Sequence, residues 1–232
     1  MNARHNPLRP DFTVVELLVV VSLIVLLLAL LLPALGNTRR WARTMVCLNN
    51  HRQLLMATSS YATDNDDYMP FTNWLANDGY WRDLGGAGWL YKYPAAYPNP
   101  FTEEHREGGA IWEYLQEGDV YHCPVDVGQR MGPSHYITSY LMNGAICGWS
   151  RKPPSYRRTQ FRSDAVVFWE PQERAMTNDY NDGSSRPNEG ITQRHHDGLV
   201  LGSIDGQANR VSWDEYLGLL GEDPGPLWCD PQ

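Results

Sequence analysis

The sequence has few basic residues and lacks the short motifs of common enzyme classes. Its 19 lysines and arginines stand against 27 aspartates and glutamates, and the formal net charge is -8. Because nucleic-acid binding needs a basic surface that neutralises phosphates, we expect no nucleic-acid partner. The G-x-S-x-G elbow, the phosphate-binding P-loop and H-E-x-x-H are all missing from the sequence. These absences predict that the protein is not an enzyme.

Cysteines are few and widely spaced. The four are Cys47, Cys123, Cys147 and Cys229, and no two of them form a C-x-x-C pair. Structural zinc sites usually contain closely spaced cysteines, so this spacing argues against zinc, and we expect neither a metal site nor a cofactor. If the chain is exported, disulfides are allowed, with three full pairings. Free buried cysteines are the alternative.

Polar residues are almost absent from one stretch near the N-terminus. Between Leu17 and Leu32 only Ser22 is polar. Residues 12–35 would form about 36 Å of helix, enough to cross a hydrocarbon core of ~30 Å. The apolar run is longer than that of most secretory signal peptides, so an uncleaved transmembrane helix is predicted and a cleaved signal peptide is the alternative.

Glu16 is the one carboxylate in this segment, and a charge in lipid needs a partner or water. It lies either near the helix end among lipid headgroups or beside a cation on a neighbouring helix. Flanking charge leaves the orientation ambiguous. The arginines of the two flanks are Arg4 and Arg9 before the segment, and Arg39, Arg40 and Arg43 after it.

The N-terminal pattern matches a known family. Counted from Phe12, Glu16 is the fifth residue and Pro33 the twenty-second, and a short basic segment precedes them. Residues 9–70 thereby resemble type IV pilins and type II secretion pseudopilins, particularly the pseudopilin G-like group. The resemblance implies cleavage by a prepilin peptidase before Phe12 and methylation of its new amine. It also implies assembly with like subunits through Glu16 and a helix that kinks at Pro33.

One residue departs from the family pattern. Asp11 stands where the family has the glycine on which prepilin peptidase depends. Two alternatives follow for residues 1–11. Either they are a leader that is removed, so that Glu16 can pair with a neighbour's Phe12 amine, or they stay attached and the chain remains a permanent membrane anchor.

A second pattern lies in the C-terminal part. His195 is followed by nine residues and then by Asp205-Gly206. This spacing resembles the H-X9-DG processing-associated domain of pilin-like proteins. The two resemblances imply a leader-like segment 1–11, a transmembrane helix 12–35, an exported helix continuation 36–63 and a pilin-like head 64–232, in which the H-X9-DG region is 195–206.

The fold class follows from local patterns. Apolar residues recur at helical spacing between Trp41 and Ala62, and Pro70 with the acidic cluster before it ends the helix. Residues 165–169 read as a buried strand, and residues 199–212 form a hairpin in which Asp205-Gly206 makes a type I′ turn. We also expect one helix at 108–116. The prediction is an α+β protein, with a long N-terminal helix packed on a small antiparallel sheet with long loops.

Two sets of residues are weak metal candidates. Asp64, Asp66 and Asp67 are dense in oxygen, but the Gly and Glu of an EF-hand loop are missing, so calcium is only a weak candidate. The second set is His195, His196 and Asp197, but adjacent residues on a strand point to opposite faces, so a shared metal would need a loop there. His195 and Asp205 should lie at opposite ends of one strand, roughly 33 Å apart unless residues 195–198 fold back, which argues against an acid-base pair. We therefore expect His195 to be a structural histidine that bonds to loop backbone.

Aromatic residues are abundant, with 9 Trp and 13 Tyr. Seven crowd a Gly- and Pro-rich stretch: Trp74, Tyr80, Trp81, Trp89, Tyr91, Tyr93 and Tyr97. Packing of an irregular core is the first interpretation, and an exposed surface that stacks on sugar rings is the second. The sequence thus favours a structural pseudopilin-like subunit of the inner membrane with its head in the periplasm or outside the cell. The alternative is an anchored glycan-binding module that does not polymerise.

Overall fold

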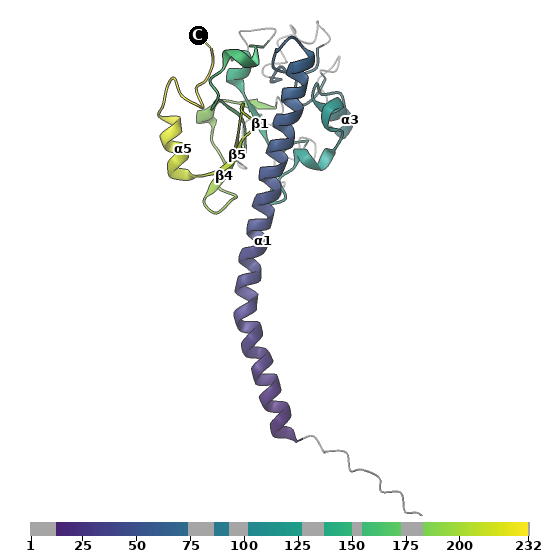
Figure 1. Cartoon of the computed structure of the whole chain (residues 1–232), viewed down its shortest axis with the longest axis vertical. Helices are drawn as coiled ribbons and strands as arrows, with labels where there is room; N and C mark the ends of the chain where they lie inside the picture. The colour runs from purple at the N-terminus through teal and green to yellow at the C-terminus, as the bar shows by residue number, and fades with distance from the viewer. Residues whose placement is uncertain are drawn as a thin grey trace, which may run out of the picture. The chain divides into compact units, whose positions relative to one another are not determined.

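The computed structural model describes residues 13–73, 86–92, 102–126, 137–149, 155–172 and 183–231. The chain divides into two compact units, Met1–Ala42 and Arg43–Gln232. A single helix, α1 (Val14–Asp64), contributes to both units (Figure 1). Asp11 and Phe12, the predicted cleavage and methylation positions, lie outside the described residues, as does the leader-like segment.

In the first unit, α1 begins with a capping box that includes Glu16. The backbone N–H and the hydroxyl of Thr13 each donate to Glu16 Oε2 at 2.8 Å. The Glu16 N–H donates in return to Thr13 Oγ1 at 3.2 Å. This reciprocal arrangement satisfies N–H groups at the start of the helix. The carboxylate that the sequence analysis found unusual therefore has bonding partners within its own first turn.

The N-terminal part of α1 is apolar and exposed. Its leucines and valines show between 47% and 79% of their surface at positions 14–35. The helix is long and apolar enough to cross a membrane. Pro33 lies inside the helix, which runs on without a break to Asp64.

The second unit is built on a five-stranded sheet in the order β3-β1-β2-β4-β5. The strands are β1 (Leu141–Asn143), β2 (Val166–Trp169), β3 (Ser184–Ser185), β4 (Gly198–Ser203) and β5 (Ala208–Ser212). Three neighbouring pairs are antiparallel, whereas β1 and the short edge strand β3 are parallel. The α+β architecture is confirmed, as is the buried strand that became β2, but the sheet is mixed rather than purely antiparallel.

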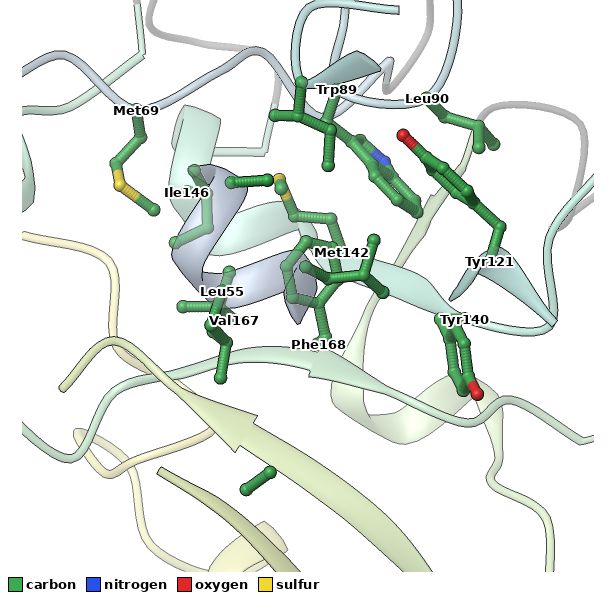
Figure 2. Packing of buried hydrophobic residues seen from close by; sticks show 14 of the residues in the cluster. Leu55, Met69, Trp89, Leu90, Tyr121, Tyr140, Met142, Ile146, Val167 and Phe168 are labelled. Atoms are coloured by element: carbon green, nitrogen blue, oxygen red, sulfur yellow. The ribbon is translucent and has the colours of Figure 1, made fainter. Parts of the chain in front are cut away.

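The sheet has a hydrophobic cluster on each face. One cluster joins the head part of α1 to side chains such as Phe168 and Val200. The other joins Trp169 and Leu201 to Tyr216 of α5 (Trp213–Leu220). In Figure 1 the head part of α1 and helix α5 lie on opposite sides of the strands. Figure 2 shows Leu55 of α1 directed at the β2 side chains Val167 and Phe168.

The structure confirms the predicted positions of the hairpin and of the end of the long helix. α1 ends at Asp64, and β4 and β5 flank Asp205-Gly206. The type I′ turn is wrong, however, because Gly206 has a positive φ of 87° and Asp205 does not. The Gly206 N–H donates to Ser203 O at 2.9 Å, and the Ser203 N–H donates to Gln207 O at 2.8 Å. The loop is therefore one residue longer than a two-residue turn.

The single helix expected at 108–116 is also wrong. Of residues 108–116 only Trp112–Leu115 are α-helical, as the short helix α4, and a turn separates α4 from the short helix α3 (Glu103–Glu107) before it. A side chain at Gly109 would have its Cβ 2.6 Å from Leu90 O, so this glycine lets two backbone segments pass closely. Short 3-10 turns complete the unit: η2 (Gly118–Tyr121), η4 (Gly144–Cys147), η5 (Arg158–Gln160) and η6 (Pro187–Glu189).

Candidate metal centre

Four side chains of the types that can bind a metal ion meet inside the second unit. In the part of the chain that the structure describes, Cys47, Cys123, Glu170 and His195 form a group whose ligand atoms all lie within 4.8 Å of one another. All four residues are buried. Each comes from a different part of the fold: α1, the loop after η2, the end of β2 and the turn before β4. The cluster therefore joins the helix to the sheet.

The distances within the cluster define its centre. Cys47 Sγ and Cys123 Sγ are 2.7 Å apart, and Cys123 Sγ lies 3.5 Å from His195 Nε2. The same His195 Nε2 lies 3.0 Å from Glu170 Oε1. One ring nitrogen thus faces both a sulfur and a carboxylate oxygen. Two thiols, an imidazole and a carboxylate are the donor types that hold zinc in proteins.

Neighbouring groups hold the ligands in place. The hydroxyl of Thr44 lies 3.1 Å from His195 Nδ1, one helical turn before Cys47 on α1. The Val200 N–H donates to Glu170 Oε2 at 2.9 Å and so fixes the second carboxylate oxygen. Such bonds to the outer atoms of a ligand orient its inner atom towards a shared centre.

A β-bulge directs Glu170 to the helix side of the sheet. In the pairing of β2 with β4, Val166 faces Ser203 while Phe168 faces Gly202, so Val167 is an extra residue. Side chains alternate between the two faces of a strand, and an extra residue reverses the faces of all that follow. Phe168 therefore belongs to the hydrophobic cluster against α1, and Trp169 belongs to the cluster on the opposite face of the sheet. Glu170, the next residue, faces α1 again.

His195 is placed by an unusual turn. His196 and Asp197 both have positive φ, at 52° and 60°, a conformation that costs energy for residues other than glycine. The His195 N–H donates to Gly198 O at 3.0 Å and closes the turn. A Cβ at Gly198 would lie 2.1 Å from a carbonyl oxygen of β5, so only glycine fits there. The segment 195–198 folds back and brings His195 to α1.

A buried ion pair ties two of the ligand-bearing loops together. Arg194 Nη1 lies 3.1 Å from Asp126 Oδ2, and both side chains are about 2% exposed or less. Arg194 precedes His195, and Asp126 lies three residues after Cys123 in a turn that its own N–H closes onto Cys123 O at 2.9 Å. The Cys123 N–H is in turn held by Ser139 Oγ at 2.9 Å. The pair therefore fixes the loop of Cys123 against the turn of His195.

The cluster is electrostatically coupled. Burial acts to raise the pKa of Glu170, but the hydrogen bond and charge of His195 outweigh it and lower the pKa to about 2. Burial likewise acts to lower the pKa of His195, and its bonds to Cys123 and Glu170 raise it to about 9. The bond to Cys47 lowers the pKa of Cys123 to about 7, and the same bond raises the pKa of Cys47. The lowered pKa of Glu170 and the raised pKa of His195 both favour a charged carboxylate–imidazolium pair beside the two sulfurs.

Comparison with known proteins gives partial matches to acetyl-coenzyme A synthetases. Acetyl-coenzyme A synthetase 2 of Pseudomonas aeruginosa is 28% identical over 125 residues, which cover 50% of this chain and 18% of that protein. The acetyl-coenzyme A synthetase of Bradyrhizobium sp. is 27% identical over 128 residues, with the same two shares. The chain thus spans about 18% of the length of the curated relatives it matches. No family model and no solved structure matches the chain.

The sequence analysis found part of this cluster. It singled out Cys47, Cys123 and His195, but it set zinc aside for want of a C-x-x-C pair, and it did not consider Glu170. His195 was expected to bond to loop backbone, which is wrong for its ring, whose partners are the side chains of Thr44, Cys123 and Glu170. An acidic residue directly after an apolar buried strand is the signal that could have pointed to Glu170.

The other candidate residues lie elsewhere. Asp205 is exposed and accepts from the Gln207 N–H at 3.0 Å, so it belongs to the hairpin turn with Gly206 and not to the site of His195. Cys147 lies 3.1 Å from Thr72 Oγ1, and Cys229 lies 3.5 Å from Asn143 Nδ2. No disulfide joins any of the four cysteines.

The acidic cluster at the end of α1 has protein partners. Asp64 Oδ2 accepts from the Tyr114 hydroxyl at 3.1 Å. Asp67 forms an ion pair with Arg158 at 3.1 Å and accepts two hydrogen bonds from Thr159. Asp66 is exposed with a φ of 51°. The carboxylates of Asp64 and Asp67 thus bind two different parts of the head, and the calcium prediction receives no support from this geometry.

Two of the seven aromatic residues are core residues. Trp89 and Tyr91 are fully buried, and Trp89 packs near Phe168 with ring centres 5.0 Å apart (Figure 2). The other five, Trp74, Tyr80, Trp81, Tyr93 and Tyr97, lie outside the described residues. For Trp89 and Tyr91 the core-packing interpretation is confirmed.

Proposed function

We propose that the protein is a pilin-like structural subunit, held in the inner membrane by the N-terminal part of α1 and carrying the unit Arg43–Gln232 as an exported head. The observation that carries the proposal is the difference in burial between the two parts of α1. The apolar stretch of its N-terminal part has no buried residue. Its C-terminal part supplies core residues to the head, including Leu54 and Leu55. A lipid-facing anchor that continues into a folded head is the design that the pilin resemblance implies.

Assembly is the second part of the proposal. Apolar side chains of the anchor would pack against those of like or related subunits, because helices in lipid associate mainly through close packing. Glu16 is bonded within its own capping box, which supports stable insertion of the helix whether or not the leader is removed. The host would be a type II secretion or type IV pilus-like system.

Membrane topology tests the proposal directly. The tagged full chain should stay in the membrane fraction after alkaline extraction, and protease should digest its head in spheroplasts without lysis. Recovery in the soluble cytosolic fraction, or a head that resists protease until the cells are lysed, contradicts the proposal. A mutant with arginine at Leu23 and Leu27 is the control, because two charges near the middle of the anchor should abolish membrane retention.

N-terminal sequencing decides between a filament subunit and a permanent anchor. A mature chain that begins at Phe12 supports polymerisation through Glu16 and Pro33. A chain that keeps Met1 supports the non-polymerising anchor, which the Asp11 substitution favours. A glycan array then tests the binding role, since retention of no glycan by the head removes that alternative.

The partial matches to acetyl-coenzyme A synthetases cover 18% of those enzymes and are the one distant hint of catalysis. A structural subunit as proposed above has no such activity. Incubation of the purified chain with acetate, ATP and coenzyme A checks this. Formation of acetyl-coenzyme A above the level of a heat-denatured sample would contradict the non-catalytic proposal.

A further inference from the structure

We propose that Cys47, Cys123, His195 and Glu170 bind a zinc ion that fastens α1 to the sheet of the head. Two thiolates, an imidazole nitrogen and a carboxylate oxygen make a four-ligand set of the kind that holds structural zinc. Soft thiolate ligands also disfavour magnesium and calcium, which prefer oxygen. The inference depends on the geometry of the head alone, so its failure would leave the proposed membrane function untouched.

The spacing of the donor atoms suits one ion. Ligand atoms bound to zinc at about 2.0–2.3 Å in a tetrahedron lie roughly 3.3–3.8 Å apart. The distance of 3.5 Å between Cys123 Sγ and His195 Nε2 falls in this range, whereas His195 Nε2 and Glu170 Oε1, 3.0 Å apart, would have to separate slightly. The sulfurs, 2.7 Å apart, would separate by about 1 Å.

The outer bonds of the ligands favour a metal over a disulfide. A disulfide would use the two sulfurs alone and give no role to the His195–Glu170 pair, whose ligand atoms lie within 4.8 Å of both sulfurs. Thr44 is hydrogen-bonded to His195 Nδ1, so the other ring nitrogen, Nε2, faces the sulfurs and the carboxylate. Histidines that bind a metal usually have such a hydrogen bond at the nitrogen that does not bind the ion. Val200 occupies Glu170 Oε2 and leaves Oε1 for the centre. Both ligands are therefore oriented for a shared ion.

The charges also admit a divalent cation. In a zinc complex the two thiols and the imidazolium release their protons to solvent, which leaves two thiolates, a neutral imidazole and a carboxylate. The ion cancels two of these three negative charges. Arg194 lies close enough to act on Glu170, but it is paired with Asp126, so the complex keeps one negative charge. Without the ion, the same residues depend on the His195–Glu170 pair to compensate the carboxylate.

Zinc content and thiol state of the full chain test the inference. The protein is purified in detergent without reductant, incubated with zinc sulfate, dialysed and analysed by elemental mass spectrometry and by intact mass. We expect about one zinc ion per chain and four free thiols after denaturation in chelator. A zinc-free chain with Cys47 and Cys123 joined in one cross-linked peptide would overturn the proposal.

Variants locate the ion. Cys123→Ser should abolish stoichiometric zinc, whereas Cys147→Ser, which changes another buried cysteine outside the cluster, should retain it. Thr44→Val keeps all four ligands and should weaken zinc affinity by roughly 10-fold to 100-fold, measured by competition with a chelating dye. Equal zinc content and affinity in all three variants would place the ion elsewhere and refute the site.

Cobalt gives a readout that does not depend on the folding of any variant. Co²⁺ added to the wild-type chain should produce a thiolate-to-metal charge-transfer band and the intense visible bands of a tetrahedral complex, both removed by added zinc. Weak bands of octahedral cobalt with no charge transfer would show that the thiolates do not bind, and would overturn the proposal.

Discussion

Replacement of Leu55 by alanine should destabilise the head strongly, because Leu55 anchors α1 to the sheet. Its side chain is 4% exposed and packs between the helix and the β2 residues shown in Figure 2. The substitution removes three carbon atoms, worth about 2.4 kcal/mol of transfer free energy at ~0.8 kcal/mol for each buried methylene. The cavity that remains adds to this loss, so a total of about 2–5 kcal/mol is expected.

The neighbouring residue supplies the control. Met56 lies one position along the same helix and is 67% exposed, so Met56→Ala should change stability by less than about 0.5 kcal/mol. Both variants are unfolded thermally as full chains in detergent, followed by the fluorescence of the buried tryptophans. At about 2–4 °C per kcal/mol, a loss of about 2–5 kcal/mol in Leu55→Ala should lower the Tm by roughly 4–20 °C. Equal Tm values for Leu55→Ala and Met56→Ala would refute the packing of α1 on the sheet.

Three further changes test other contacts. Asp126→Ala leaves Arg194 buried without its carboxylate and should cost about 3–5 kcal/mol in urea unfolding, whereas a loss below about 1 kcal/mol would contradict a buried pair. Gly202→Ala places a Cβ 3.1 Å from atoms of α1 and should cost about 1–3 kcal/mol, and unchanged stability would show that the helix can move away. Burial acts to raise the pKa of Asp67, but bonds from Thr159 and the charge of Arg158 lower it. Its stabilising effect is therefore fully present above the unfolded pKa of about 4 and is lost as the pH falls through the lower pKa of the folded state. The Tm advantage of wild type over Asp67→Asn should hold at neutral pH and shrink as the pH falls below about 4. A difference that stays constant over this range would contradict the pairing.

Local sequence patterns were enough to predict the elements that depend on local chemistry. The helical spacing around Leu48 and Leu55 predicted the continuation of α1, and the apolar run 165–169 predicted β2. Asp205-Gly206 predicted the hairpin. The turn type was missed because a two-residue and a three-residue loop contain the same Asp-Gly signal, and register with the rest of the sheet decides between them.

The cluster of Cys47, Cys123, Glu170 and His195 could not be predicted by the same means. Its ligands are separated by 76, 47 and 25 positions along the chain, so no local spacing joins them. The face of Glu170 depends on the extra residue Val167, and the position of His195 depends on a left-handed turn at His196 and Asp197. The bulge depends on how β2 pairs with β4, and the turn depends on how β4 pairs with β5. A local pattern of residue types does not show how strands pair, so it could not predict either feature.

The buried face of α1 explains how the helix and the cluster depend on each other. Beside its leucines, this face carries Thr44, Cys47, Asn50 and His51, all 5% exposed or less. Asn50 Nδ2 donates to His122 O at 2.9 Å, and Thr44 bonds to His195, so both polar groups have directional partners on other segments. An apolar stripe tolerates rotation of a helix by some degrees, whereas hydrogen bonds of this kind weaken steeply with misalignment. The polar residues therefore fix the rotation of α1, and that rotation in turn presents Cys47 to Cys123. A cluster that binds an ion would hold the same rotation more firmly, which is why loss of zinc and loss of the Thr44 hydroxyl should act on the same contact between helix and sheet.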